Sequence, residues 1–205
     1  MKRVAVTGLG VISPVGNDVP TFWNALCSGT CGIGPITKFD ATDYPVKLAA
    51  EVRDFDPKQY MEKLDILHSD VYTHFAMAAA CQAVADSGIA GTLDAERVGV
   101  YIGSGIGGIA TFMTEHSKLL NRGPRRVSPY FIPMMIPNMA SSMIAMRYHF
   151  HGPAMPMVTA CASGTNAIGE ALRLIRHGYA DAMVAGGAEA TVNALAAAGF
   201  SNMQA

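Results

Sequence analysis

The sequence is poor in charged residues, aromatic residues and cysteine. Charged residues account for 15% of the 205 positions and aromatic residues for 8%, and the formal net charge is −1 at pH 7. A chain this close to neutrality has no broad basic field, so we expect no nucleic-acid partner. The 4 cysteines are too few, in a chain of this length, to form the framework of a disulfide-rich domain.

Long apolar runs and ligand clusters are also missing. No stretch approaches the roughly 18 consecutive apolar residues of a membrane span, so we expect no membrane partner. The apolar start of the chain is interrupted at Gly8 and Gly10, which is too early for the core of a signal peptide. Cys27 and Cys31 lie close together, but no second pair of cysteines or histidines completes a zinc set. We therefore predict no metal, no cofactor and a reducing, cytoplasmic setting.

Apolar residues are abundant and alternate between two patterns. They make up 50% of the chain, which suits a large core and a buried subunit interface. Short apolar runs predict strands at residues 3–7, 48–52, 98–102, 154–158 and 181–185, and we expect those at 3–7 and 154–158 to be buried. Helical spacing predicts helices that follow Asp18, Ser69 or Asp70, the glycines after residue 102, and Cys161. The helix after Ser69 or Asp70 is predicted to end at Gly88, and residues 30–43 are predicted to be a loop. This order predicts an α/β fold in which a mostly parallel, mixed sheet is packed between helices.

Residues 158–164, with the sequence Val-Thr-Ala-Cys-Ala-Ser-Gly, lie where a predicted strand turns into a helix. The first amides of a helix have no acceptor within the helix, and this end carries partial positive charge. A thiolate at Cys161 is stabilised there, the small neighbours admit a substrate carbonyl, and the free amides could hold an oxyanion. Cys161 is therefore a candidate nucleophile. The alternative is a small buried core residue, which is the commonest fate of a free cysteine.

The predicted helix after this turn has an apolar face. Its members recur at spacings of three and four residues, and they are Cys161, Thr165, Ile168, Leu172 and Ile175. We expect this face to pack into the core.

Glycines at residues 103–108 follow the strand at residues 98–102 and formally match the G-x-G-x-x-G pattern of dinucleotide sites. The dinucleotide interpretation needs an acidic residue at the end of a second strand, and a helical pattern follows instead. We interpret the glycines as tight backbone packing beside an active-site cavity, with Ile106 pointing into it. Residues 128–149 are rich in proline and methionine, which is typical of core, of an acyl-chain pocket or of a subunit interface.

Taken together, the motifs resemble a known family. They occupy residues 4–16, 103–108, 123–129, 159–164 and 184–189. In this order they resemble the β-ketoacyl-[acyl-carrier-protein] synthases, the condensing enzymes of bacterial type II fatty-acid synthesis. Members of this family have a thiolase-like fold of two similar halves and are about twice as long. The resemblance implies that residues 1–205 form the N-terminal half.

The resemblance also assigns roles to individual residues. Cys161 would accept the acyl group from acyl carrier protein, and its own backbone N–H would be one oxyanion donor. Ile106 would line the acyl pocket, and the segment from Phe131 to Asn138 would lie near the far end of that pocket and the dimer interface. The implied reaction is decarboxylative Claisen condensation of the acyl chain with malonyl-carrier protein, performed by a cytoplasmic homodimer without a cofactor.

The sequence departs from the family pattern in two respects. The two catalytic histidines of the family belong to the second half, and none of the 6 histidines here matches them. We therefore expect residues 1–205 alone to be inactive in condensation, although Cys161 could still be acylated. Where the family has basic residues that bind the acidic carrier, this chain has Leu64, Leu67 and His68, with only Lys63 positively charged.

Two alternatives to the condensing enzyme stay open. One is a non-catalytic dimer partner that shapes a chain-length cavity, although such relatives usually lack the cysteine. The other is a split subunit or interaction module of half length, whose uncovered apolar surface would drive association.

Overall fold

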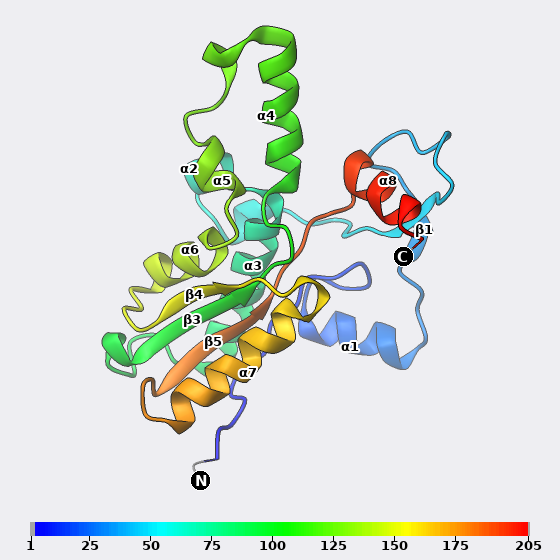
Figure 1. The fold of residues 1–205 in the computed structure, drawn as a ribbon. Helices are drawn as coiled ribbons and strands as arrows, with labels where there is room; N and C mark the ends of the chain where they lie inside the picture. Colours follow the sequence, from blue (N-terminus) through cyan, green and yellow to red (C-terminus); the bar gives the residue numbers. More distant parts are fainter. Residues whose placement is uncertain (1–2, 205) are drawn as a thin grey trace.

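A three-stranded parallel sheet organises the computed structural model, which describes residues 3–204 (Figure 1). Its strands, in spatial order, are β4 (Ala154–Met157), β3 (Val98–Gly103) and β5 (Ala182–Gly187). Gly103, the last residue of β3, pairs with Met157 on one side and with Gly187 on the other. Because the strands are parallel, their carboxyl ends meet at one edge of the sheet. The predicted α/β class with a mostly parallel sheet is confirmed.

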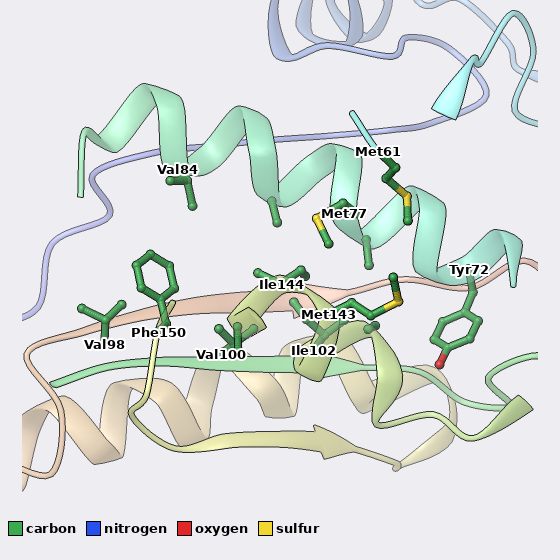
Figure 2. Packing of buried hydrophobic residues seen from close by; sticks show 14 residues of the cluster. Met61, Tyr72, Met77, Val84, Val98, Val100, Ile102, Met143, Ile144 and Phe150 are labelled. Carbon is green, nitrogen blue, oxygen red and sulfur yellow. The ribbon is translucent and has the colours of Figure 1, made fainter. Parts of the chain in front are cut away.

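Helices cover both faces of this sheet, with α3 and α6 on one face and α7 on the other (Figures 1 and 2). The helices are α1 (Val19–Cys27), α2 (Lys63–Leu67), α3 (Val71–Ser87), α4 (Ile109–Arg122), α5 (Phe131–Met135), α6 (Met139–Tyr148), α7 (Ser163–Arg176) and α8 (Ala194–Asn202). The 3₁₀ turns are η1 (Pro57–Gln59), η2 (Ala95–Arg97), η3 (Pro124–Arg126) and η4 (Ala160–Ala162). Within residues 3–204, none of these helices is both long and apolar enough to cross a membrane.

The ends of α1 and α3 follow from local chemistry. The Asp18 carboxylate accepts a hydrogen bond of 2.7 Å from the Thr21 amide, and Asp70 accepts one of 3.3 Å from the Tyr72 amide. Such side chains satisfy amides that the first helical turn leaves free. Helix α3 ends at Gly88, whose φ of 65° is a left-handed conformation that glycine adopts without strain. These predicted boundaries are confirmed.

The core lies between β3 and the pair of helices α3 and α6 (Figure 2). Val100 and Ile144 are fully buried there, and so is Tyr72 at the start of α3. The Tyr72 hydroxyl donates a 2.7 Å hydrogen bond to the Ile136 carbonyl, which satisfies its polar end inside the core. This layer fixes β3, and therefore the carboxyl edge of the sheet, relative to α3.

The prediction of a buried first strand at residues 3–7 is wrong. This segment is extended but belongs to no sheet, and Val6 is 81% exposed. The chain just after it lies along α3, where the Leu9 amide donates to the Asp86 carboxylate and the Val11 amide donates to Gln82. Side chains of α3 therefore take up backbone donors that a neighbouring strand would otherwise use.

The predictions for residues 30–43 and for the strand at residues 154–158 also need correction. The predicted loop at residues 30–43 contains β1 (Ile33–Pro35), which pairs antiparallel with β2 (Leu48–Ala50). The strand β4 is not buried, because it is an edge strand, and Met155 on it is 51% exposed.

The predicted apolar face of α7 does not enter the core. Ile168 is 57% exposed, whereas the small residues Ala167 and Ala171 are buried against the sheet. Helix α7 runs directly over β3 and β5, so the small side chains are the ones that allow the helix to approach them.

Candidate active site

Three glycines bring the start of α7 directly onto the carboxyl edge of the sheet. Gly103 ends β3, Gly187 ends β5, and Gly164 is in the first turn of α7. A Cβ atom on Gly103 would overlap the backbone of Ser163, and one on Gly187 would lie 2.8 Å from the Gly164 Cα. No side chain separates the helix from the strand ends, so the backbone positions of the two are fixed together.

A sharp turn between β4 and α7 presents Cys161. The Ser163 Oγ accepts a 2.9 Å hydrogen bond from the Thr159 amide and donates a 2.7 Å bond to the Ala160 carbonyl. Ala160 has a φ of 51°, a left-handed conformation that non-glycine residues adopt only at a cost of about 1–2 kcal/mol. The side-chain amide of Asn166 donates a 2.7 Å hydrogen bond to the Thr159 hydroxyl and so links this turn to the first turns of α7.

Cys161 is exposed and forms no disulfide, and it lies in η4, immediately before α7. The alternative of a buried core cysteine does not fit this position. Ala162, which precedes α7, makes no side-chain hydrogen bond to the helix, and the backbone carbonyls of Thr159 and Ala160 accept from the amides of Ala162 and Ser163. The partial positive charge of the helix end suits a developing oxyanion.

The loop between β3 and α4 lies against this turn. A Cβ atom on Gly105 would be 3.6 Å from the Ala160 carbonyl oxygen. Ile106 is the large apolar side chain of the loop and is 44% exposed. The structure therefore brings the Ile106 loop beside the Cys161 turn.

Phe131 and Asn138 lie further along the chain on the flank of this loop. Asn138 precedes α6, and its neighbour Pro137 comes within 3.2 Å of the position that a Cβ on Gly107 would occupy. Phe131 begins α5, and its ring lies 6.4 Å from that of Phe112 on α4. Asn138 is thus close to the glycine loop, whereas Phe131 contacts α4.

Sequence reasoning gave no role to Glu189, which the structure places at the centre of this region. Its carboxylate accepts hydrogen bonds from the amides of Gly105, at 2.7 Å, and Ile106, at 3.2 Å. Loss of water around the carboxylate raises the pKa of Glu189, and this effect outweighs the backbone hydrogen bonds, which lower it. The sequence feature that could have identified Glu189 is an acidic residue two positions after the end of β5, where the strand ends converge.

A cavity of about 260 Å³ borders the region and is lined by apolar residues of the N-terminal segment and α3 together with Ala188 and Glu189. A different cavity, of about 340 Å³, lies between α4 and the start of α3 and is lined in part by Asp70, Glu115 and Lys118. Among residues 3–204, no group of three or more His, Cys, Asp or Glu side chains is arranged to hold a metal ion.

Comparison with protein families and curated proteins gives a consistent result. The family described as "Beta-ketoacyl synthase, N-terminal domain" matches residues 1–205. The 3-oxoacyl-[acyl-carrier-protein] synthase 2 of Coxiella burnetii is 48% identical over 205 residues, which are 100% of this chain and 50% of that protein. The protein of the same name from Synechocystis sp. is 46% identical over 205 residues, 100% of this chain and 49% of that protein. The chain therefore spans about half the length of these curated relatives.

Solved structures of ketosynthases have the same fold. The ishigamide ketosynthase/chain length factor matches with a TM-score of 0.90 and 30% identity, over 98% of this chain and 50% of that one. A β-ketoacyl synthase from Burkholderia phymatum matches with a TM-score of 0.86 and 27% identity, over 99% and 50%. A type II polyketide ketosynthase in complex with its acyl-carrier protein matches with a TM-score of 0.83 and 25% identity, over 100% and 55%. The chain belongs to the β-ketoacyl synthase family and corresponds to its N-terminal domain.

Proposed function

We propose that this chain carries the acyl-accepting nucleophile of a 3-oxoacyl-[acyl-carrier-protein] synthase, and that the nucleophile is Cys161. The observation that supports this most directly is the exposed thiol at the start of α7, held against the carboxyl edge of the sheet. The curated relatives are named for this activity. Acyl carrier protein is the proposed partner, as in the related ketosynthase complex.

The first step transfers an acyl group from the carrier to the enzyme. The Cys161 thiolate attacks the thioester carbonyl, the new C–S bond forms, and the carrier thiol leaves. The oxyanion of the tetrahedral intermediate is held by the Cys161 backbone N–H, which belongs to η4, immediately before α7. Ile106, Phe131 and Asn138 are proposed to line or approach the pocket for the acyl chain.

The second step joins the acyl group to a two-carbon unit. Malonyl-carrier protein loses CO₂, and the resulting enolate carbon attacks the acyl carbonyl on Cys161, so that the Cys161 thiolate leaves and a 3-oxoacyl product forms. Donors must stabilise the enolate oxygen. His151 and His177 precede β4 and β5 and so lie toward the opposite edge of the sheet from Cys161. We propose that a second half of the complete enzyme supplies the two histidines, and that residues 1–205 alone do not condense.

An acylation experiment tests this function. The protein, as its native cell produces it, is incubated with acyl-carrier protein, and the adduct is located by peptide mass spectrometry. We expect one acyl group on Cys161, none in a Cys161→Ala variant, and an unchanged yield in a Cys27→Ser variant, because Cys27 is also an exposed thiol. Acylation that survives in Cys161→Ala, or elongation of an acyl chain with malonyl-carrier protein by that variant, contradicts the proposal.

A non-catalytic chain-length partner is the second candidate, because a ketosynthase/chain length factor is among the structural relatives. The exposed Cys161 favours the condensing enzyme, since a partner that only shapes a cavity needs no thiol. The acylation experiment separates the two, because the partner would accept no acyl group.

We also propose a cytoplasmic homodimer. The supporting observation is an exposed apolar surface along the edge strand β4, made by Met155 on the strand and Val158 just after it, which are each more than half exposed. Edge strands with exposed apolar side chains are suited to pairing with another chain.

A further inference from the structure

Glu189 joins the ends of the neighbouring strands β3 and β5, onto which the start of α7 packs. It follows β5, and one of its oxygens, Oε2, accepts from both the Gly105 and the Ile106 amides, which follow β3. Two consecutive amides that point at one oxygen have little freedom to rotate. The contact therefore sets the backbone orientation of this loop, and with it the direction of the Ile106 side chain.

Ser104 extends the same network. It is 2% exposed, and its Oγ accepts a 3.0 Å hydrogen bond from the Gly107 amide. That Oγ also lies 3.5 Å from each carboxylate oxygen of Glu189, a distance typical of a weak bond. Ser104 and Glu189 together hold the amides of Gly105, Ile106 and Gly107.

The loop that Glu189 holds is in contact with the nucleophile turn. A Cβ atom on Gly105 would lie 3.0 Å from the Glu189 Oε2 and 3.6 Å from the Ala160 carbonyl oxygen. Ala160 is the left-handed residue that immediately precedes Cys161. Because Gly105 approaches the Ala160 carbonyl directly, a displacement of the loop also displaces the turn.

We propose that Glu189 is a positioning residue that fixes Ile106 beside the Cys161 turn and so sets how well the thiol accepts long apolar chains relative to short ones. This inference deepens the proposed function and rests on it for the nature of the chain. Glu189 acts here as a hydrogen-bond acceptor, so the position of its oxygen matters, whereas its charge and its proton do not.

Two conservative substitutions separate geometry from charge. Glu189→Gln keeps a side-chain oxygen within reach of both amides but removes the charge. Glu189→Asp keeps the charge but withdraws the oxygen by about 1.5 Å, the length of one C–C bond. We expect Gln to behave like the wild type, and Asp and Ala to be impaired. Glu96→Ala is the matched control, because Glu96 is exposed in η2, before the opposite end of β3.

The measurement compares two alkylating probes on Cys161. Iodoacetamide reports the thiol alone, and N-dodecyl iodoacetamide reports the thiol with an apolar chain. For Asp and Ala we expect the ratio of long-probe to short-probe rates to fall by about five-fold or more, because a displaced pocket residue weakens chain binding. The Gln variant and the Glu96→Ala control keep the wild-type ratio. With acyl-carrier donors, the impaired variants show a raised KM for long chains at little change in kcat.

Several outcomes overturn the inference. If Gln is as impaired as Ala, the charge or the proton is needed. If Asp keeps the wild-type ratio, the oxygen position does not matter. An equal loss with both probes shows a purely structural role. If the Ala variant does not fold, the Asp and Gln variants decide the question. Alkylation requires no acyl transfer, so a wild type that accepts no acyl group contradicts the proposed function while the probe ratio is still measured.

Discussion

At Gly103, a hydrogen atom is the largest side chain that the structure accommodates. The backbone of Ser163 occupies the place that a Cβ would take, and backbone cannot move aside as a flexible side chain can. Gly169, in the middle of α7, is different, because nothing lies within 4 Å of the position of its Cβ. A side chain added at Gly103 would therefore meet backbone, whereas one added at Gly169 would meet open space.

These two glycines give a paired prediction. Gly103→Ala should lower the free energy of unfolding by about 3 kcal/mol, the upper part of the range for overpacked sites, because α7 must shift. Gly169→Ala should raise it by about 0.5–1 kcal/mol, because alanine favours a helix interior. Urea unfolding followed by circular dichroism measures both. A neutral Gly103→Ala would mean that α7 is not held against β3 as described.

Among the elements, α3 is joined to its neighbours by buried polar groups. Asp70 caps α3 and also accepts hydrogen bonds from the amide and the hydroxyl of Thr111 on α4, at 2.8 and 2.7 Å. His74 on α3 is 8% exposed, and its Nε2 lies 3.2 Å from the Ile66 carbonyl of α2. A carbonyl accepts, so this ring nitrogen carries the hydrogen. The junction of α2, α3 and α4 thus depends on a neutral, buried imidazole.

The junction should make stability depend on pH. Burial lowers the pKa of His74 below its ordinary value of 6.5, although the Ile66 bond and Asp70 oppose this. The unfolded chain then binds the proton more readily, so the stabilisation is present above pH 6.5 and is lost as the pH falls through the folded pKa.

The quantity to measure is the difference in the free energy of unfolding between about pH 7 and about pH 5, which lie above and below the ordinary pKa of histidine. His74→Gln retains an amide donor for Ile66 and does not titrate. It should lose less stability on acidification than the wild type. Equal losses in the two proteins would assign the pH dependence to other groups.

For the molecule as a whole, exposed apolar side chains differ in whether they lie beside the open edge of the sheet. Met155 lies on the edge strand β4, and it is 51% exposed. Leu120 is more exposed, at 71%, but lies near the far end of α4, away from the sheet (Figure 1). Exposure alone therefore does not identify an interface, whereas continuity with an open strand edge does.

The proposed dimer is tested by a charge at each of these two positions. Met155→Glu should shift the native protein from dimer to monomer, because a carboxylate would be buried without a partner. Leu120→Glu should leave the dimer intact. Sedimentation equilibrium on the protein as its cell produces it measures both, and a dimer that tolerates Met155→Glu would exclude this surface as the interface.

The limits of prediction follow from which interactions are local. Helix α3 was predicted at both ends because Asp70 and Gly88 act on residues next to them. The strand predicted at residues 3–7 failed because sheet membership requires a neighbour, which local sequence does not specify. Glu189 was missed because its partners, Gly105 and Ile106, lie more than 80 residues earlier.

At the site, the sequence indicated the place of Cys161 but not its surroundings. The strand-to-helix turn was correctly located, since a strand, small residues and a helical pattern follow one another. The face of α7 was assigned the wrong way round, because apolar spacing cannot distinguish a core from an open surface, and Ile168 is exposed. The roles of Cys161, Ile106, Phe131 and Asn138 stay predictions.

The contact of Gly103, Gly164 and Gly187 also bears on how such a site can evolve. Any single substitution at Gly103 or Gly187 adds a carbon atom that meets backbone, so inherited variation there is open to strong selection. The loop of Ile106 has no such constraint on its exposed side chain. Over evolution, substitutions in the loop can therefore change which acyl chains are accepted, while the contact of the three glycines keeps Cys161 in the same position.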